Sequence, residues 1–116
     1  MNASLLDRDL ERDRDVYERF DPFDDTLFFK TGARGVICFH GPNFNIRKRL
    51  TDDERKRLLS SPLFVRVSSN CYINIRKVSD IDDAYVYFAG SGKSPDAKRV
   101  AVSGRTQQLI RRKLQS

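Results

Sequence analysis

The chain has 116 residues and a net charge of +6 at neutral pH, and a single domain of this length buries about two-thirds of its unfolded surface. No apolar run approaches the ~20 residues that cross a bilayer, and the N-terminus lacks the apolar segment of a signal peptide. The two cysteines, Cys38 and Cys71, are not spaced like a zinc site or a disulfide framework. Composition argues against membrane insertion, and we expect a cytoplasmic protein that binds no metal and no cofactor.

Charge is distributed unevenly along the chain. Residues 1–25 hold nine acidic residues and four arginines, a net charge of −5. The remaining 18 basic and 7 acidic residues give residues 26–116 a charge of +11. A basic domain suits a polyanion, because DNA releases condensed counterions when Lys and Arg neutralise its phosphates. Many proteins are merely basic, so charge favours a nucleic-acid partner without deciding it.

Residues 1–21 are predicted to form an acidic helical arm ahead of a domain over residues 22–116. Ser4 can cap the arm helix, and Pro22 ends it. Two interpretations compete. In one, the helix is solvated and its thin apolar stripe docks on the domain or on a partner chain. In the other, the arm controls nucleic-acid binding by occupying the basic surface or by dimerising.

Short strands are predicted after the arm. The apolar runs are residues 27–29, 36–39 and 44–46, and the turns between them are residues 31–35 and 41–43. Arg34 lies between the two glycines of the first turn. Arg47, Lys48 and Arg49 then form a basic cluster, which we expect to track a phosphate backbone rather than to recognise bases.

A short helix is predicted after this cluster. Thr51 and Glu54 have the spacing of a capping box, and residues 60–62 provide the stop. Leu58 and Leu59 are expected to pack on its inner side, and residues 55–57 are expected to form a solvated basic face.

Residues 63–81 carry the most regular pattern in the chain, an alternation with a period of two. The odd positions are mostly apolar and form one row. The even row comprises Phe64, Arg66, Ser68, Asn70, Tyr72, Asn74 and Arg76. Successive side chains of a strand point to opposite faces, so the pattern predicts an apolar row backed by a mostly polar one. The polar row contains no carboxylate before Asp80, so it can contact phosphates and base edges, as in the core strands of a DNA-binding β domain.

Residues 85–88 and 100–102 predict a hairpin, joined by a flexible loop. Within this loop, Gly92-Lys93-Ser94 resembles part of a phosphate-binding loop. That motif needs a glycine five residues before Gly92, where Tyr87 stands, and a helix after it, so the spacing excludes it.

A last helix is predicted over residues 106–114. Its apolar side is expected to hold Leu109, Ile110 and Leu114, with basic residues opposite them and Ser103 as a cap.

The sequence disfavours two further chemistries. Cys38 and His40 share strand parity, so a thiol–imidazole pair is conceivable, but no carboxylate is placed to orient the imidazole. Cys38 stands between apolar neighbours and Cys71 lies in the apolar row, which favours core positions for both. Eight Phe and four Tyr could stack on single-stranded bases, but most lie at core phase in the strands. We expect no enzyme activity.

The strand pattern from residue 63 onward resembles the LytTR family of bacterial DNA-binding domains. The matching residues are Phe64, Arg66-Val67, Ser68-Ser69, Tyr72-Ile73-Asn74, Lys77, Val102-Ser103 and Arg105, with a looser match at Asp25-Thr26-Leu27-Phe28-Phe29. The resemblance covers residues 22–116 and implies a mainly β domain with short helices.

The resemblance also implies a mode of binding in which loops between strands enter successive major grooves. The candidate DNA-binding residues are Arg105, Ser69, Asn70, Arg34, Arg66, Ser68, Arg47, Lys48 and Ser103. Arg105 is the strongest, because a guanidinium can donate two hydrogen bonds to guanine, worth ~1–3 kcal/mol of discrimination. The alternative for Arg105 is a helix-start arginine held by a phosphate or an acid. Serine at position 69 has a short reach, so Asn70 can take over that contact.

The family resemblance further implies direct-repeat promoter sites bound by two copies, a homodimer on bent DNA, in transcription regulation. Residues 1–25 are too short for a receiver domain, so regulation is expected from abundance, from the acidic arm or from a partner protein. Two rivals remain. One is a protein–protein interaction module that kept the fold and lost sequence-specific binding, and the other is a non-specific nucleic-acid binder.

Overall fold

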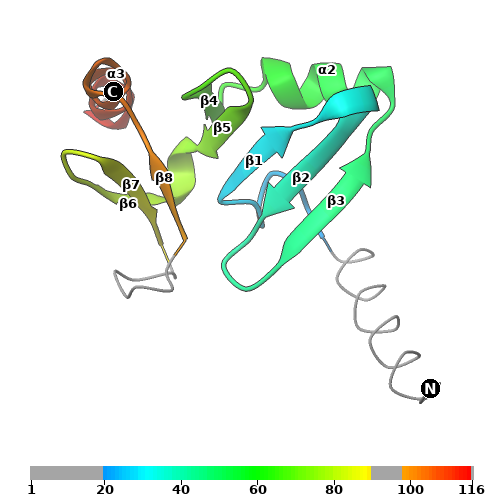
Figure 1. Ribbon diagram of the computed structural model, residues 1–116, viewed down its shortest axis with the longest axis horizontal. Coiled ribbons are helices and arrows are strands. Elements are labelled where there is room, and N and C mark those ends of the chain that lie inside the picture. Colours follow the sequence, from blue (N-terminus) through cyan, green and yellow to red (C-terminus); the bar gives the residue numbers. More distant parts are fainter. Residues whose placement is uncertain (1–19, 90–97, 116) are drawn as a thin grey trace, which may run out of the picture.

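The computed structural model describes residues 20–89 and 98–115, which form two antiparallel sheets and two α-helices (Figure 1). The larger sheet has the order β3-β2-β1-β5-β4 and the smaller one the order β6-β7-β8. This architecture confirms the mainly β fold with short helices. The predicted arm helix and most of the predicted hairpin loop lie outside the described residues, and the domain boundary at residue 22 stays a prediction.

The strands are short. Those of the larger sheet are β1 (Phe28–Thr31), β2 (Val36–His40), β3 (Asn45–Arg49), β4 (Phe64–Arg66) and β5 (Cys71–Asn74). Those of the smaller sheet are β6 (Val78–Ile81), β7 (Tyr85–Phe88) and β8 (Arg99–Ala101). The 3-10 turn η1 (Ala33–Gly35) joins β1 to β2, and η2 (Ile75–Lys77) joins β5 to β6. The helices are α2 (Asp52–Ser60) and α3 (Gly104–Gln115). Strand β3 runs further than predicted, so the basic cluster at 47–49 is part of an edge strand.

Each face of the larger sheet carries its own apolar cluster. One cluster joins it to the smaller sheet and α3, and contains Leu27, Phe28, Val65, Cys71, Ile73, Ile81, Val86, Phe88, Val100 and Ile110. The other lies under α2 and contains Phe29, Ile37, Phe39, Ile46, Leu58 and Phe64. Phe20, inside the predicted arm, packs its ring against that of Phe39 with the ring centroids 5.2 Å apart.

The second cluster corrects the prediction of a polar row over residues 63–81. Phe64 is buried, Tyr72 is half-buried and stacks on Phe29, and Asn74 is fully buried. The amide nitrogen of Asn74 donates to the carbonyls of Phe23 (3.0 Å) and Thr26 (2.9 Å), and its side-chain oxygen accepts from the Arg76 backbone amide (3.0 Å), which together satisfy its buried polar atoms. Of the even row, Arg66, Ser68, Asn70 and Arg76 face solvent, whereas Phe64, Tyr72 and Asn74 pack against the second cluster or against residues 23–26.

The capping box of α2 is confirmed. The Thr51 hydroxyl accepts from the Glu54 amide at 3.1 Å, and the Glu54 carboxylate accepts from the Thr51 amide at 3.0 Å. The bond from the Thr51 amide to the carboxylate is the first cause of the lowered pKa of Glu54. Leu58 is buried as expected, but Leu59 is 36% exposed, so its predicted inward position is wrong. Among the described residues, no helix is both long and apolar enough to cross a membrane.

Candidate nucleic-acid interface

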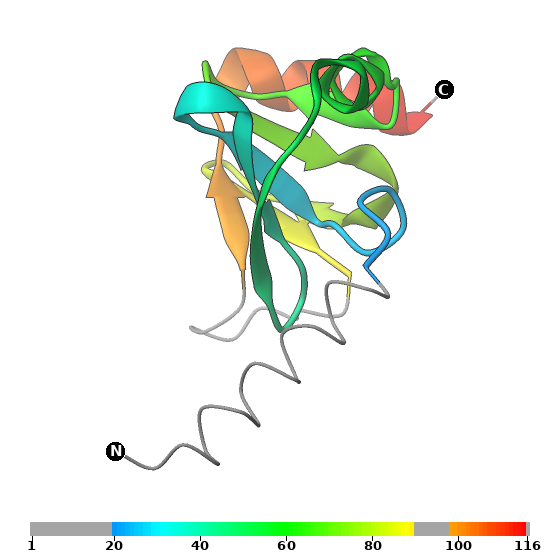
Figure 2. The same ribbon diagram turned by 90° about the vertical axis from the view of Figure 1, so that its right-hand side faces the viewer.

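Three segments far apart in the sequence lie along one edge of the molecule. They are residues 32–35 between β1 and β2, residues 67–70 between β4 and β5, and residues 103–105 at the start of α3. All three lie at the top of Figure 1, and in Figure 2 they lie together at the upper left. A hydrogen bond from the Thr31 amide to the Asn70 carbonyl (2.8 Å) ties the first segment to the second. We call these three segments the loop edge.

The turn over residues 32–35 projects Arg34 in an unusual backbone conformation. Arg34 has φ of 60° and Gly35 has φ of 76°, so two consecutive residues are left-handed. Glycine adopts this region freely, whereas a residue with a side chain is strained there. The turn is held by bonds from the Gly32 amide to the Val36 carbonyl (2.8 Å) and from the Leu50 amide to the Gly35 carbonyl (3.1 Å). Arg34 is therefore an exposed cation on a fixed turn.

Arg66 organises the second segment. Its guanidinium donates through Nε to the Ser68 carbonyl (3.1 Å) and through Nη2 to the Ser69 carbonyl (3.3 Å). The Ser68 hydroxyl lies 3.4 Å from the Asn70 side-chain oxygen, and the Val67 amide donates to the Cys71 carbonyl at 2.9 Å. Arg66 thus faces its own loop, while the side chains at 68–70 are exposed.

The third segment is fixed by the packing of α3 on the smaller sheet. The Ser103 hydroxyl accepts from the Thr106 amide at 3.3 Å, which confirms the predicted cap. Gln107 is buried and its amide donates to the Asp83 carbonyl at 2.6 Å, and Arg111 donates to the Ile81 carbonyl at 3.2 Å. Arg105, in the first turn, is exposed and makes no hydrogen bond or ion pair with a described residue.

The predicted apolar side of α3 is partly wrong. Ile110 is fully buried, but Leu109 is 41% and Leu114 46% exposed. The inward face instead holds Gln107 beside Ile110, because Gln107 finds carbonyl partners at the end of the smaller sheet. Helical periodicity alone could not have found a buried glutamine.

The basic cluster of β3 is divided between the two faces of the sheet. Arg47 pairs with Cys38, and Arg49 pairs with Val36, on one face. Lys48 points to the opposite face, where it lines a pocket with Phe39 and Leu58 beneath α2. The structure therefore does not place Arg47 and Lys48 on one surface, as strand alternation requires.

Cys38 and His40 do not form a catalytic pair with any described carboxylate. The His40 ring stacks on Phe28 with centroids 4.4 Å apart. Burial lowers the pKa of His40, and the nearby charges of Lys98 and Lys30 lower it further. Burial also raises the pKa of the Cys71 thiol. Within residues 20–89 and 98–115, no group of three or more His, Cys, Asp or Glu side chains could hold a metal ion.

Two lysines with a place in the structure were not singled out from the sequence. Lys98 donates to the carbonyls of Gly41 and Phe44 and to the side-chain oxygen of Asn45, the last two at 2.7 Å. It thereby ties the start of β8 to the β2–β3 turn, a contact that no local pattern signals. Lys30 shares the strand parity of buried Phe28 yet is exposed. A charged residue in a core row is the signal that could have marked it.

Comparisons with known proteins show likeness to solved structures and none to a family model or a curated protein. Among solved structures it is similar to the LytTr DNA-binding domain of a methyl-accepting/DNA response regulator from Bacillus cereus, at 15% identity over 81% of this chain and 84% of that chain, with a TM-score of 0.49. A likeness at this identity concerns the course of the backbone and does not carry over the other protein's function.

Proposed function

We propose that the domain binds double-stranded DNA sequence-specifically as a transcription regulator, with the loop edge in the major groove. The observation that carries this proposal is the meeting of three separate segments at one edge, each with exposed basic or polar side chains on a hydrogen-bonded backbone. Such groups recognise phosphates and base edges. The charge of +11 on residues 26–116 and the LytTR-like motif of the strands support the same reading.

The residues of the loop edge take different roles in this proposal. Arg105 donates two hydrogen bonds to a guanine, Ser69 and Asn70 contact an adjacent groove, and Arg34 reaches the backbone or a base at the far end. Ser68 and Arg66 shape the 67–70 loop, and Ser103 holds the start of α3. Arg47 and Lys48 bind phosphates, each on its own side of the sheet.

Two copies of the domain bind direct repeats in this proposal, as a homodimer on bent DNA. Smooth bending over such a site costs of order 1–6 kcal/mol, which phosphate contacts from the basic domain offset. Control then comes from abundance, from the acidic arm or from a partner protein.

One observation favours the interaction-module alternative. Leu109 and Leu114 are large apolar side chains on the outer surface of α3, and exposed apolar residues of this kind can form a protein interface. In that case the fold serves a protein partner, and neither random nor selected DNA binds well.

The test is selection from a pool of random duplexes at near-physiological salt, followed by sequencing of the bound fraction. Two similar half-sites, one or two helical turns apart, are the expected result. Arg105→Ala should then lower affinity for the selected site by about 5- to 150-fold, from ~1–3 kcal/mol. Affinity for random DNA should change little. Equal small losses on both duplexes would indicate non-specific binding, and no DNA binding would favour the interaction module.

A further inference from the structure

The fold uses several of its cations internally. Arg66, Lys98 and Arg111 donate to backbone carbonyls, and Arg99 lies over the ring of Tyr85, 4.4 Å from its centroid. Lys30 and Arg49 differ from these four: both are exposed, and neither makes a hydrogen bond or ion pair with a described residue. Their charges are available to a polyanion.

Lys30 and Arg49 lie on the same face of the larger sheet. Directly paired residues of antiparallel strands share a face, and Lys30 pairs with Cys38, which pairs with Arg47. Arg49 lies two residues beyond Arg47 in β3, so it shares that face as well. Lys30 and Arg47 are two strand spacings apart, roughly 10 Å, and Arg47 and Arg49 are roughly 7 Å apart along the strand.

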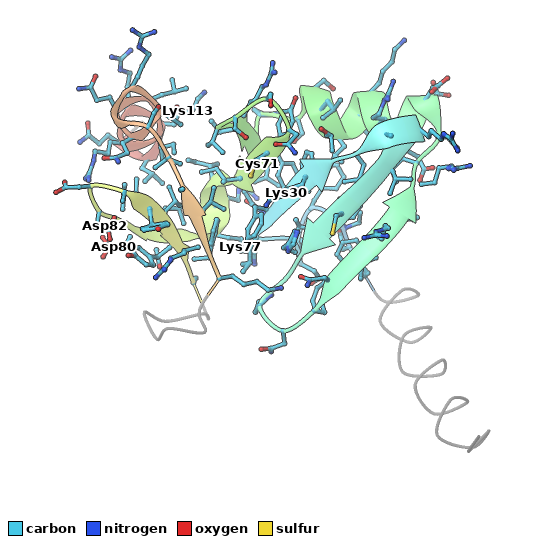
Figure 3. The ribbon with its side chains drawn as sticks, in the orientation of Figure 1. Lys30, Cys71, Lys77, Asp80, Asp82 and Lys113 are labelled. Atoms are coloured by element: carbon cyan, nitrogen blue, oxygen red, sulfur yellow. The ribbon has the colours of Figure 1, made fainter. Side chains whose placement is uncertain are left out.

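This face is open over β2 and β3. In the sheet, Lys30 of β1 lies between Cys38 of β2 and Cys71 of β5. Cys71 is buried under the smaller sheet, whereas Cys38 is half-exposed. The covering layer therefore ends near Lys30. Figure 3 shows Lys30 in the gap between the two sheets, next to Cys71, and no described helix or strand crosses the near face of β2 and β3. We call the surface around Cys38, with Lys30, Arg47 and Arg49, the open sheet face.

The open sheet face adjoins the loop edge at two points. Lys30 pairs with Cys71, the residue after the 67–70 loop, and its neighbour Thr31 bonds to Asn70. Arg49 pairs with Val36, the residue after the 32–35 turn. A duplex seated on the loop edge would bring the phosphates that flank the recognised bases towards these two cations.

We propose that the open sheet face is a second phosphate-binding surface, which holds the DNA backbone as it leaves the loop edge. Lys30 and Arg49 are its principal contacts, and Arg47 lies between them. Lys48 is excluded, because it points to the α2 side of the sheet. This inference rests on the proposed function and adds to it a sequence-independent contact that favours DNA bent towards the domain.

The test uses the full chain with Lys30→Gln and Arg49→Gln combined. Its matched control is Arg55→Gln with Lys56→Gln, two exposed cations on α2, which packs on the other face. Fluorescence anisotropy measures affinity for the selected site and for a scrambled duplex over a range of salt concentrations. Each lost phosphate contact lowers the slope of log K against log salt by about 0.9.

The open-face variant should therefore reduce the magnitude of the slope by about 2 relative to the wild-type protein. For two proteins with equal affinity at ~1 M salt, this makes the variant bind roughly 30-fold more weakly than the wild type at ~0.15 M salt. The selected and scrambled duplexes should lose affinity alike, and the control variant should keep its slope.

If the wild-type protein selects a site but the open-face variant keeps the wild-type slope, or changes it no more than the control variant does, this inference is wrong. The proposed function would be unaffected by that result. Loss of selectivity in the variant would also overturn the inference, because the residues would then contact bases. A wild-type protein without site preference overturns the sequence-specific function, while a lowered slope in the variant would still support the open sheet face. No DNA binding at all would overturn both.

Discussion

Removing the Arg66 guanidinium should loosen the 67–70 loop and weaken site-specific binding. The guanidinium makes two hydrogen bonds to loop carbonyls, at 3.1 and 3.3 Å, in an exposed position. A net hydrogen bond contributes about 0.5–1.5 kcal/mol, and exposure places this pair near about 1 kcal/mol in total. That corresponds to roughly a fivefold change in the population of the ordered loop. In Arg66→Ala, affinity for the selected site should fall by a similar factor.

Amide hydrogen exchange provides the direct assay of this effect. Bonds from the Val67 amide to the Cys71 carbonyl and from the Thr31 amide to the Asn70 carbonyl close the loop, so both amides should exchange about fivefold faster in the variant. Arg66→Lys separates positioning from charge, because lysine keeps the charge and loses the two-pronged donor. Arg76→Ala is the control, since Arg76 is exposed on η2 and its side chain has no described partner. Unchanged exchange, or full affinity in Arg66→Lys, would refute the positioning role.

Three further predictions concern stability. Asn74→Ala removes two hydrogen bonds and leaves the carbonyls of Phe23 and Thr26 without a donor. The free energy of unfolding, measured with urea, should therefore fall by about 2–4 kcal/mol, and a fall below about 1 kcal/mol would contradict this reasoning. Lys98→Met removes the link between β8 and the β2–β3 turn and should lower the free energy of unfolding by about 1–3 kcal/mol in the same assay. An unaltered unfolding curve would contradict this prediction. The pKa of His40 is lower in the folded protein than its unperturbed value of 6.5. Around that pH the unfolded chain therefore binds more protons than the folded protein does, so stability should fall as the pH drops through it. His40→Gln should remove this part of the pH dependence between about pH 7.5 and 5.5, and a wild-type stability that rises on acidification over that range would contradict the sign.

Features set by neighbours in the sequence were predictable. The Thr51–Glu54 capping box and the β7–β8 hairpin depend on local spacing, and both occur where that spacing predicts them. The cap at Ser103 is another such case. Local patterns sufficed because each of these features is completed by residues within a few positions or by one adjacent strand.

Features set by a second layer or a distant strand were not predictable in the same way. Asn74 looks like a surface residue by parity, but its amide partners lie 48 and 51 residues away in sequence. The link from Lys98 to the β2–β3 turn spans a similar separation. The division of Arg47 from Lys48 follows from alternation alone, and was missed because the predicted strand ended at residue 46. At the candidate site, the sequence named the side chains of the loop edge but could not show that the three segments meet.

The separation of the loop edge from both apolar clusters has a consequence for how this scaffold can change. Arg34, Ser69 and Arg105 belong to neither cluster, and the backbone beneath them is held by main-chain bonds, by Arg66 and by the Ser103 cap. Substitution at such exposed positions usually changes folding stability by less than about 0.5 kcal/mol. Ser69 and Arg105 can therefore be randomised together in a library while the rest of the domain folds unchanged, whereas Arg34, at φ of 60°, is best replaced by Gly, Asn or Asp. Under the proposed function, such a domain is suited to a change of target sequence through substitutions at a few exposed positions.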